Sequence, residues 1–133
     1  EDRYITFTCS LEQNIEELNG RDLINKEIIR LSSLIYNTYY LDDKNKESKD
    51  EEYVNMIKNF VVATDNFVVY RPSFALYTVL AGYHWFLDWG RDTLIAFEGV
   101  LLKTKRYKEA KEVLLTCIRD IRFGLVPNRI FWI

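Results

Sequence analysis

The fold of this chain is decided by residues 93–121, which read TLIAFEGVLLKTKRYKEAKEVLLTCIRDI. Apolar residues fill most of the first ten positions, and they recur at helical spacing from Tyr107 to Ile121. The cationic link at 103–106 suits the end of a helix, where carbonyl groups attract positive charge. The pattern predicts two antiparallel helices. The first should be buried on most sides, and the second should bury one face and end near Gly124.

Two more helices are predicted before this pair. Asp22 can cap the first, of about 17 residues, since an N-terminal carboxylate accepts backbone N–H bonds. Its apolar stripe consists of Ile24, Ile28, Leu31, Ile35 and Tyr39. The second helix ends at Asp65-Asn66, and its stripe consists of Tyr53, Met56, Ile57, Phe60 and Val61. The charged and polar stretch 42–52 between them predicts a solvated loop.

A smaller β component is also expected. Residues 67–70 and 76–80 are rich in β-formers, and the turn-like stretch 71–73 lies between them. This pattern predicts a β-hairpin inserted between helices. Residues 3–9 form a strand-like stretch with no partner nearby. The sequence therefore predicts a mainly α fold with a minor β part.

Composition limits the possible functions. The 133 residues suffice for one domain, and 48% hydrophobic residues with 15% aromatic ones support a folded core. A net charge of -2 leaves no basic excess to bind a phosphate backbone, so no nucleic-acid partner is expected. No apolar run reaches the roughly 20 residues needed to span a bilayer, so no membrane partner is expected, and the charged start is unlike a signal peptide.

Cysteine usage and the two ends complete the general expectations. Cys9 and Cys117 have no metal or redox spacing and are expected to be reduced core thiols, as in a cytoplasmic protein. Both ends look cut, because an orphan strand opens the chain and Phe131-Trp132-Ile133 closes it. We expect a piece of a larger protein, whose apolar flanks could drive self-association.

The stretch 83–93, YHWFLDWGRDT, carries the chemistry. A guanidinium donates several hydrogen bonds and a carboxylate accepts several, so Arg91 and Asp92 can bind the vicinal hydroxyls of a sugar. Trp85 and Trp89 offer flat apolar faces to the C–H side of a pyranose. Gly90 allows a tight turn or a close approach to a ligand. The cluster favours a sugar-binding site.

Each of these residues has a simpler explanation when it is taken alone. Asp92 would be an N-cap, Arg91 a surface charge and the tryptophans core residues. Asp88 lies four positions before Asp92, but the intervening glycine argues against a helical catalytic pair. We therefore expect Asp88 either to support the binding residues or to bond the ligand. The lone His84 is expected to be structural.

A second notable run ends in Asn128 and Arg129, after Gly124 and Pro127. It is either an ordinary helix-terminating loop or a segment that faces the same mouth as Arg91. No phosphate-binding glycine loop, nucleophile elbow or metal-ligand cluster is recognisable, so no cofactor or metal is expected.

The dense segment, with Ala81-Gly82 before it, resembles the signature of glycogen debranching enzymes in their amylo-α-1,6-glucosidase domain. The resemblance runs from about 63 to 129 and includes 99–102 and 124–129. It departs from the family at Asn66, where a Gln is usual, and after Arg129. The Trp-Gly-Arg-Asp-Thr core at 89–93 is its most specific part.

The resemblance implies an (α/α)6 toroid that often follows an N-terminal β-rich domain. Residues 1–21 would be the tail of that domain or a linker, and 22–133 the N-terminal part of the toroid. The implied reaction is removal of α-1,6-linked glucosyl stubs from glycogen or maltooligosaccharides, with inversion. The resemblance implies that Arg91 and Asp92 bind hydroxyls of the terminal glucose and that Trp85 and Trp89 shape its pocket. With Asp88, Asn128 and Arg129 from the residues themselves, these are the predicted substrate-binding residues. The general acid and base are expected beyond Ile133, so no catalytic residue is assigned here and the fragment alone should be inactive.

Two other readings of the sequence remain. A carbohydrate-binding helical module would use the same tryptophans and the same Arg-Asp pair without chemistry. A helical interaction domain would hold the aromatic cluster merely as core. Oligosaccharide binding separates the last reading from the other two.

Overall fold

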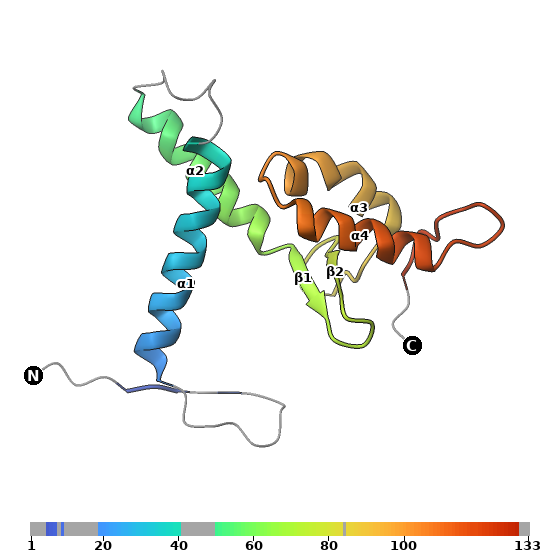
Figure 1. Cartoon of the computed structure of the whole chain (residues 1–133), viewed down its shortest axis with the longest axis horizontal. Helices are drawn as coiled ribbons and strands as arrows, with labels where there is room; N and C mark the ends of the chain where they lie inside the picture. Colours follow the sequence, from blue (N-terminus) through green and yellow to red (C-terminus); the bar gives the residue numbers. More distant parts are fainter. Residues whose placement is uncertain (1–4, 8, 10–18, 41–49, 84, 131–133) are drawn as a thin grey trace, which may run out of the picture.

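The structure is a computed structural model that describes residues 5–7, 9, 19–40, 50–83 and 85–130. It confirms a mainly helical chain with a small two-stranded sheet. The elements in chain order are α1 (Gly20–Ile35), η1 (Tyr36–Tyr40), α2 (Glu51–Asp65), β1 (Val68–Arg71), β2 (Leu76–Val79), α3 (Gly90–Phe97), η3 (Glu98–Leu102) and α4 (Tyr107–Arg119). In Figure 1, α1 and α2 lie on one side and the sheet, α3 and α4 on the other.

The first two helices begin at side-chain caps. The Asn19 side chain accepts a hydrogen bond from Arg21 N at 3.0 Å, so the expectation that Asp22 caps the helix is wrong. Asn19 can do so because it keeps an extended backbone. Asp50 caps α2 in the same way, so the helix already includes the acidic residues 51 and 52, which we expected in the loop. Residues 42–49 of that loop lie outside the described residues.

The apolar stripe of α1 is covered only at its end. Tyr39 is 4% exposed, whereas Ile24 is 62% and Ile28 56% exposed. The helix contacts α2 through Arg30, whose Nη1 donates to Asp65 Oδ1 at 3.0 Å. Arg106, at the start of α4, donates to the same oxygen. One carboxylate therefore links three helices.

The charges around Asp65 determine its protonation. Burial alone would raise the pKa of Asp65, but the hydrogen bonds from Arg30 and Arg106 outweigh it, and the pKa is lowered. Bonds to Glu27 and then to Asp65 raise the pKa of Arg30. The carboxylate of Asp65 is thus held ionised between two guanidinium groups.

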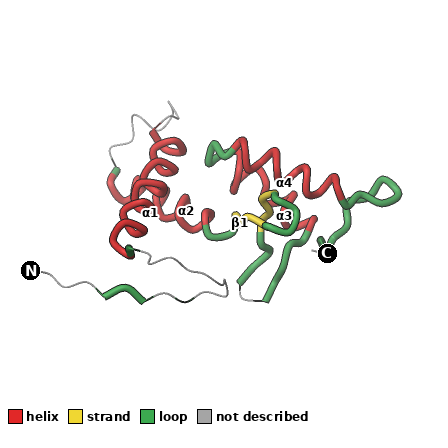
Figure 2. The backbone as a smooth tube through the Cα atoms, turned by 60° about the horizontal axis from the view of Figure 1, so that its bottom comes forward, coloured by secondary structure: helices red, strands yellow, loops and turns green. Residues whose placement is uncertain are grey.

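The core lies between the sheet and the last two helices. β1 and β2 pair antiparallel, with Val68 opposite Val79 and Arg71 opposite Leu76. Figure 2 shows this short ribbon next to α3 and α4. Its inner residues pack into a cluster formed by Val79, Leu101, Ala110 and Val113. Fully burying such side chains stabilises the fold by roughly 1.5–3 kcal/mol each.

The two helices of residues 93–121 depart from expectation in two ways. Figure 1 shows α4 running back along α3 and η3, as predicted for an antiparallel pair. Leu101 is fully buried, but Ile95 is 77% exposed, so the first helix is not buried on most sides. α4 ends at Arg119 rather than near Gly124. The chain then makes a turn in which Phe123 and Gly124 both have positive φ, 54° and 79°, and Arg122 and Leu125 pair.

Two expectations about the N-terminal residues, a strand at 3–9 and a buried Cys9, are not met by the described residues. Residues 5–7 and 9 are not in a strand, and the rest of the predicted strand 3–9 lies outside the described residues. Cys117 is buried, but Cys9 is exposed, so the prediction of two core thiols is wrong for Cys9. Within the described part of the chain, no helix is long and apolar enough to cross a membrane.

Candidate functional site

The segment that leads into α3 is held on both sides by backbone contacts. On one side Ala81 N donates to Leu87 O at 3.0 Å, next to an isolated bridge between Leu80 and Asp88. On the other side Gly90 N donates to Asn128 O at 2.9 Å, and Ile130 N donates to Asp88 O at 3.0 Å. The segments 88–90 and 128–130, nearly 40 positions apart, therefore lie side by side.

Gly90 is required by this arrangement. A Cβ atom at this position would lie 2.4 Å from the carbonyl oxygen of Pro127 and 3.2 Å from Val126 Cγ1. The sequence suggested a tight turn or a close approach to a ligand. The close approach exists, but it is to the backbone of the chain itself.

An open pocket of about 620 Å³ adjoins the start of α3. Its described lining consists of Gly90, Arg91, Leu94, Ile95, Val126 and Asn128. Arg91 N donates to the Asn128 side-chain oxygen at 3.3 Å, so two of the predicted binding residues meet directly. Of the two explanations left open for Asn128, the structure supports the one in which it shares a mouth with Arg91.

The chemistry of this pocket suits a polyhydroxylated ligand. Arg91 supplies guanidinium donors, and the amide of Asn128 supplies donors and an acceptor. Leu94, Ile95 and Val126 give an apolar wall for C–H groups. The lining residues that the structure describes include no carboxylate, so these side chains can bind and orient a sugar but provide no acid–base pair.

Asp88 is not among the lining residues of the pocket. It is 0% exposed, and its two carboxylate oxygens accept hydrogen bonds from Arg71 Nη2 at 2.9 Å and Arg71 Nε at 3.1 Å. A fully buried carboxylate with both oxygens engaged by a guanidinium does not reach a ligand. The placement favours the supporting role that the sequence left open, rather than direct contact with the substrate.

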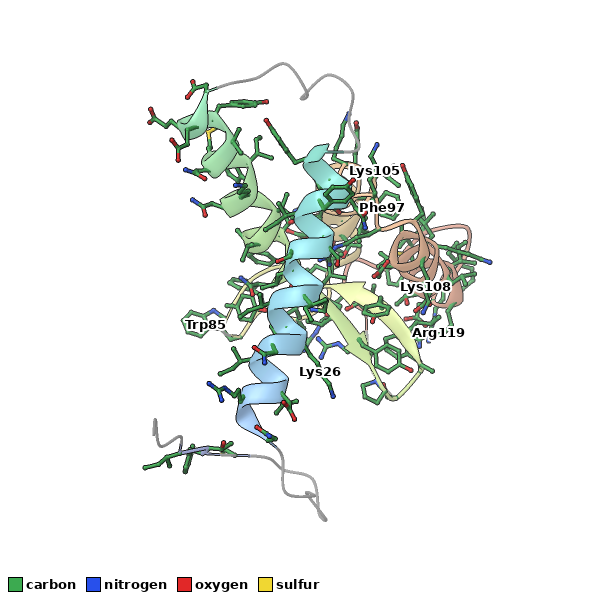
Figure 3. The ribbon with its side chains drawn as sticks, turned by 60° about the vertical axis from the view of Figure 1, so that its left-hand side comes forward. Lys26, Trp85, Phe97, Lys105, Lys108 and Arg119 are labelled. Carbon is green, nitrogen blue, oxygen red and sulfur yellow. The ribbon has the colours of Figure 1, made fainter. Side chains whose placement is uncertain are left out.

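The other predicted binding residues lie around the pocket without lining it. Asp92 is exposed in the first turn of α3, but it is not the N-cap, because the helix begins at Gly90 after Trp89. Trp89 is partly buried and pairs through its backbone with the exposed Arg129. Trp85 is 75% exposed, and Figure 3 shows it at the edge of the molecule, pointing outward. His84 lies outside the described residues.

A larger pocket of about 850 Å³ lies along α2. All its described lining residues come from that one helix: Glu51, Glu52, Asn55, Met56, Asn59, Phe60 and Ala63. A hollow on the surface of one helix has no second wall to orient a ligand. We therefore prefer the smaller pocket, where a helix start and a distant segment converge. Among the described residues no group of three or more His, Cys, Asp or Glu could hold a metal ion.

Sequence reasoning missed Arg71 and the apolar wall. The sequence pattern predicts only a turn position for Arg71, although this residue ends a β-rich stretch 17 residues before Asp88. A cation at the end of a half-buried strand, with an acid in a nearby aromatic cluster, was the available signal. Leu94 and Ile95 were assigned to the core because their exposure depends on tertiary packing, not on spacing.

The residues of the pocket match a known family. A comparison with protein-family models finds amylo-alpha-1,6-glucosidase over residues 62–131. Among curated proteins, the glycogen debranching enzyme of Saccharomyces cerevisiae is 45% identical over 40 residues. That stretch covers 30% of this chain and 3% of the yeast protein, so the match spans a small part of that relative. No solved structure matches.

Proposed function

The chain belongs to the amylo-alpha-1,6-glucosidase family, and we propose that its pocket at the start of α3 binds the terminal glucosyl unit of an α-1,6 branch stub in a glycogen-type α-glucan. The reaction is hydrolysis of that branch linkage during glycogen debranching. The chain supplies part of the substrate site, and the general acid and base lie beyond Ile133.

One observation carries the proposal. Arg91 and Asn128, far apart in the sequence, lie in one pocket and are joined by a hydrogen bond from the backbone of one to the side chain of the other. Both belong to the stretch that matches the family. Their donors and acceptor suit adjacent hydroxyls of a pyranose, and the wall of Leu94, Ile95 and Val126 suits its C–H face.

The remaining predicted residues would bind at the rim. Asp92 is exposed in the first turn of α3, where its carboxylate can accept hydrogen bonds from sugar hydroxyls. The helix dipole favours a negative charge at this position. The exposed Trp85, together with Trp89 and Arg129, can contact further glucose units. We further propose inversion at the anomeric carbon, a cytoplasmic location, and an (α/α)6 toroid of which residues 22–133 form the first part and residues 1–21 the preceding link.

The test is kinetic, in the full-length protein. Arg91→Ala and Asp92→Asn should each lower kcat/KM by about 10- to 100-fold toward a maltooligosaccharide that carries one α-1,6-linked glucose, since a charge-assisted hydrogen bond contributes roughly 1.5–3 kcal/mol. Asn128→Ala should lower it by up to about 10-fold, because a neutral hydrogen bond contributes roughly 0.5–1.5 kcal/mol. Arg122→Ala is the matched control, because Arg122 is exposed in the turn that follows α4. Equal kinetics for Arg91→Ala and Arg122→Ala would refute the assignment of the pocket.

A second candidate is a carbohydrate-binding module without hydrolytic activity. The described lining residues of the pocket include no carboxylate and would serve such a module equally well. Calorimetric titration with maltotetraose, together with an assay of glucose release, separates the two functions. Binding that depends on Arg91 without glucose release from the branched substrate supports the module.

A further inference from the structure

The ion pair between Arg71 and Asp88 lies two residues before the start of α3, and its carboxylate is fully buried. Arg71 ends β1, its side chain is 19% exposed, and that of Asp88 is 0% exposed. Two parallel hydrogen bonds, at 2.9 and 3.1 Å, fix the plane of the guanidinium against the carboxylate. Such forked pairs are geometrically specific, and a single ammonium cannot reproduce them.

The backbone of Asp88 is a junction for the proposed site. Its carbonyl accepts from Ile130 N at 3.0 Å, and the residue forms a bridge with Leu80 at the end of β2. Two residues later Gly90 N donates to Asn128 O, and one residue after that Arg91 N donates to the Asn128 side chain. A shift at Asp88 is therefore transmitted to both polar residues of the pocket.

Stability alone does not account for this pair. Removing two charges from water costs about as much as their attraction returns, so a buried ion pair adds little net stability compared with apolar residues of the same volume. What the pair does supply is one defined position for the segment between β2 and α3. That segment is joined by backbone hydrogen bonds to residues 128–130, and so to the two residues that the proposed function needs most.

We propose that Arg71 is a positioning residue of the glucosyl site. It holds the Asp88 carboxylate and thereby sets where Arg91 and Asn128 lie in the pocket, without touching the substrate itself. This inference rests on the proposed function of the pocket.

The chain offers a matched control. Arg106 is also buried, with 7% of its side chain exposed, and it pairs with Asp65, whose side chain is 12% exposed. Figure 1 places the turn between η3 and α4, where Arg106 lies, at the opposite end of the α3–α4 pair from the start of α3. Arg106→Lys thus makes the same substitution in a buried ion pair remote from the pocket, although Arg106 donates through Nη2 alone and Asp65 also accepts from Arg30.

The experiment compares Arg71→Lys with Arg106→Lys in the full-length protein, by thermal unfolding and by kinetics on the branched maltooligosaccharide. Both variants should lower the unfolding temperature. Only Arg71→Lys should lower kcat/KM, by about 10-fold, because displacing binding groups by a fraction of an ångström weakens productive binding. Equal kinetic losses in the two variants, or none in either, would overturn the inference.

A double-mutant cycle supplies a measurement that a purely structural role would not affect. If Arg71 acts by placing Arg91 and Asn128, then Arg71→Lys should lower kcat/KM clearly less than about 10-fold when Arg91 is already alanine, because only Asn128 then remains to be displaced. Full additivity of the two losses would overturn the positioning role. If Arg91→Ala itself has no effect, the proposed function fails, whereas a strong Arg91→Ala effect with additive behaviour means that only the role of Arg71 fails.

Discussion

Gly90→Ala tests the packing on which the pocket depends. A Cβ atom at Gly90 would lie 2.4 Å from Pro127 O, whereas an ordinary contact begins at 3.4 Å, so the two segments must separate by about 1 Å. Adding that shift to the 2.9 Å hydrogen bond from Gly90 N to Asn128 O lengthens it to about 3.9 Å, which breaks it.

The expected loss can be estimated from these distances. A broken backbone hydrogen bond costs about 1 kcal/mol and overpacking another 1–3 kcal/mol, while alanine returns at most about 1 kcal/mol of helix propensity. The net destabilisation is about 2 kcal/mol. In urea this should lower the unfolding midpoint by about 1 M without changing the slope, as measured by tryptophan fluorescence.

Gly99→Ala is the control for this prediction. A Cβ atom at Gly99 would meet nothing within 4 Å, and its φ is not positive. The substitution should be neutral or stabilising by up to about 1 kcal/mol. If Gly90→Ala has the midpoint of Gly99→Ala, the close approach of the two segments is not present in solution and the description of the pocket is wrong.

Three further predictions concern parts of the fold away from the pocket. Asp65→Asn removes the carboxylate shared by Arg30 and Arg106 and should lower the free energy of unfolding by about 3 kcal/mol at neutral pH, as measured in urea. Because the folded-state pKa of Asp65 is lowered, the stability it contributes is complete above the ordinary pKa of 3.8 and is lost as the pH falls through the folded-state pKa. The wild-type advantage over Asp65→Asn should therefore shrink in acid, and a constant advantage from pH 7 to 2 would contradict the pairing. Lys105→Gly relieves a left-handed backbone, φ 59°, and should raise stability by about 1 kcal/mol in differential scanning calorimetry, whereas a lower melting temperature would show that the lysine side chain matters more than the strain. Ellman's reagent should react quickly with the exposed Cys9 and with Cys117 only after unfolding, since burial raises the pKa of the Cys117 thiol, and rapid reaction of both thiols would mean that α4 does not pack as described.

Local patterns predicted the helices better than their ends. The stripe from Tyr53 to Val61 predicted α2, and the end at Asp65 is where the structure has it. The predicted cap Asp22 was wrong because Asn19 can cap the helix three residues earlier. The end of α4 was missed because Gly124 does not end the helix, but shares a turn with Phe123 five residues after Arg119.

At the site, the sequence indicated which residue types are chemically suitable better than it indicated where they lie. The chemistry of Arg91, Asp92 and the two tryptophans predicts a sugar-binding set, but of these four residues the described lining of the pocket includes only Arg91. That Asn128 lies beside Arg91 depends on pairing across nearly 40 positions, which no local pattern encodes. That the Asp88 carboxylate is buried and fully engaged depends on Arg71, whose strand position only the fold reveals.

The pairing of segments 88–90 and 128–130 has a consequence for the order of folding. The contacts between β2 and α4 span a similar distance along the chain, since Thr116 Oγ1 donates to Tyr77 O across 39 positions. Residues 128–130, however, follow α4, so the pocket acquires its second wall only when Asn128 arrives. During synthesis the residues of the sheet, α3 and α4 are therefore made before the proposed pocket can be completed.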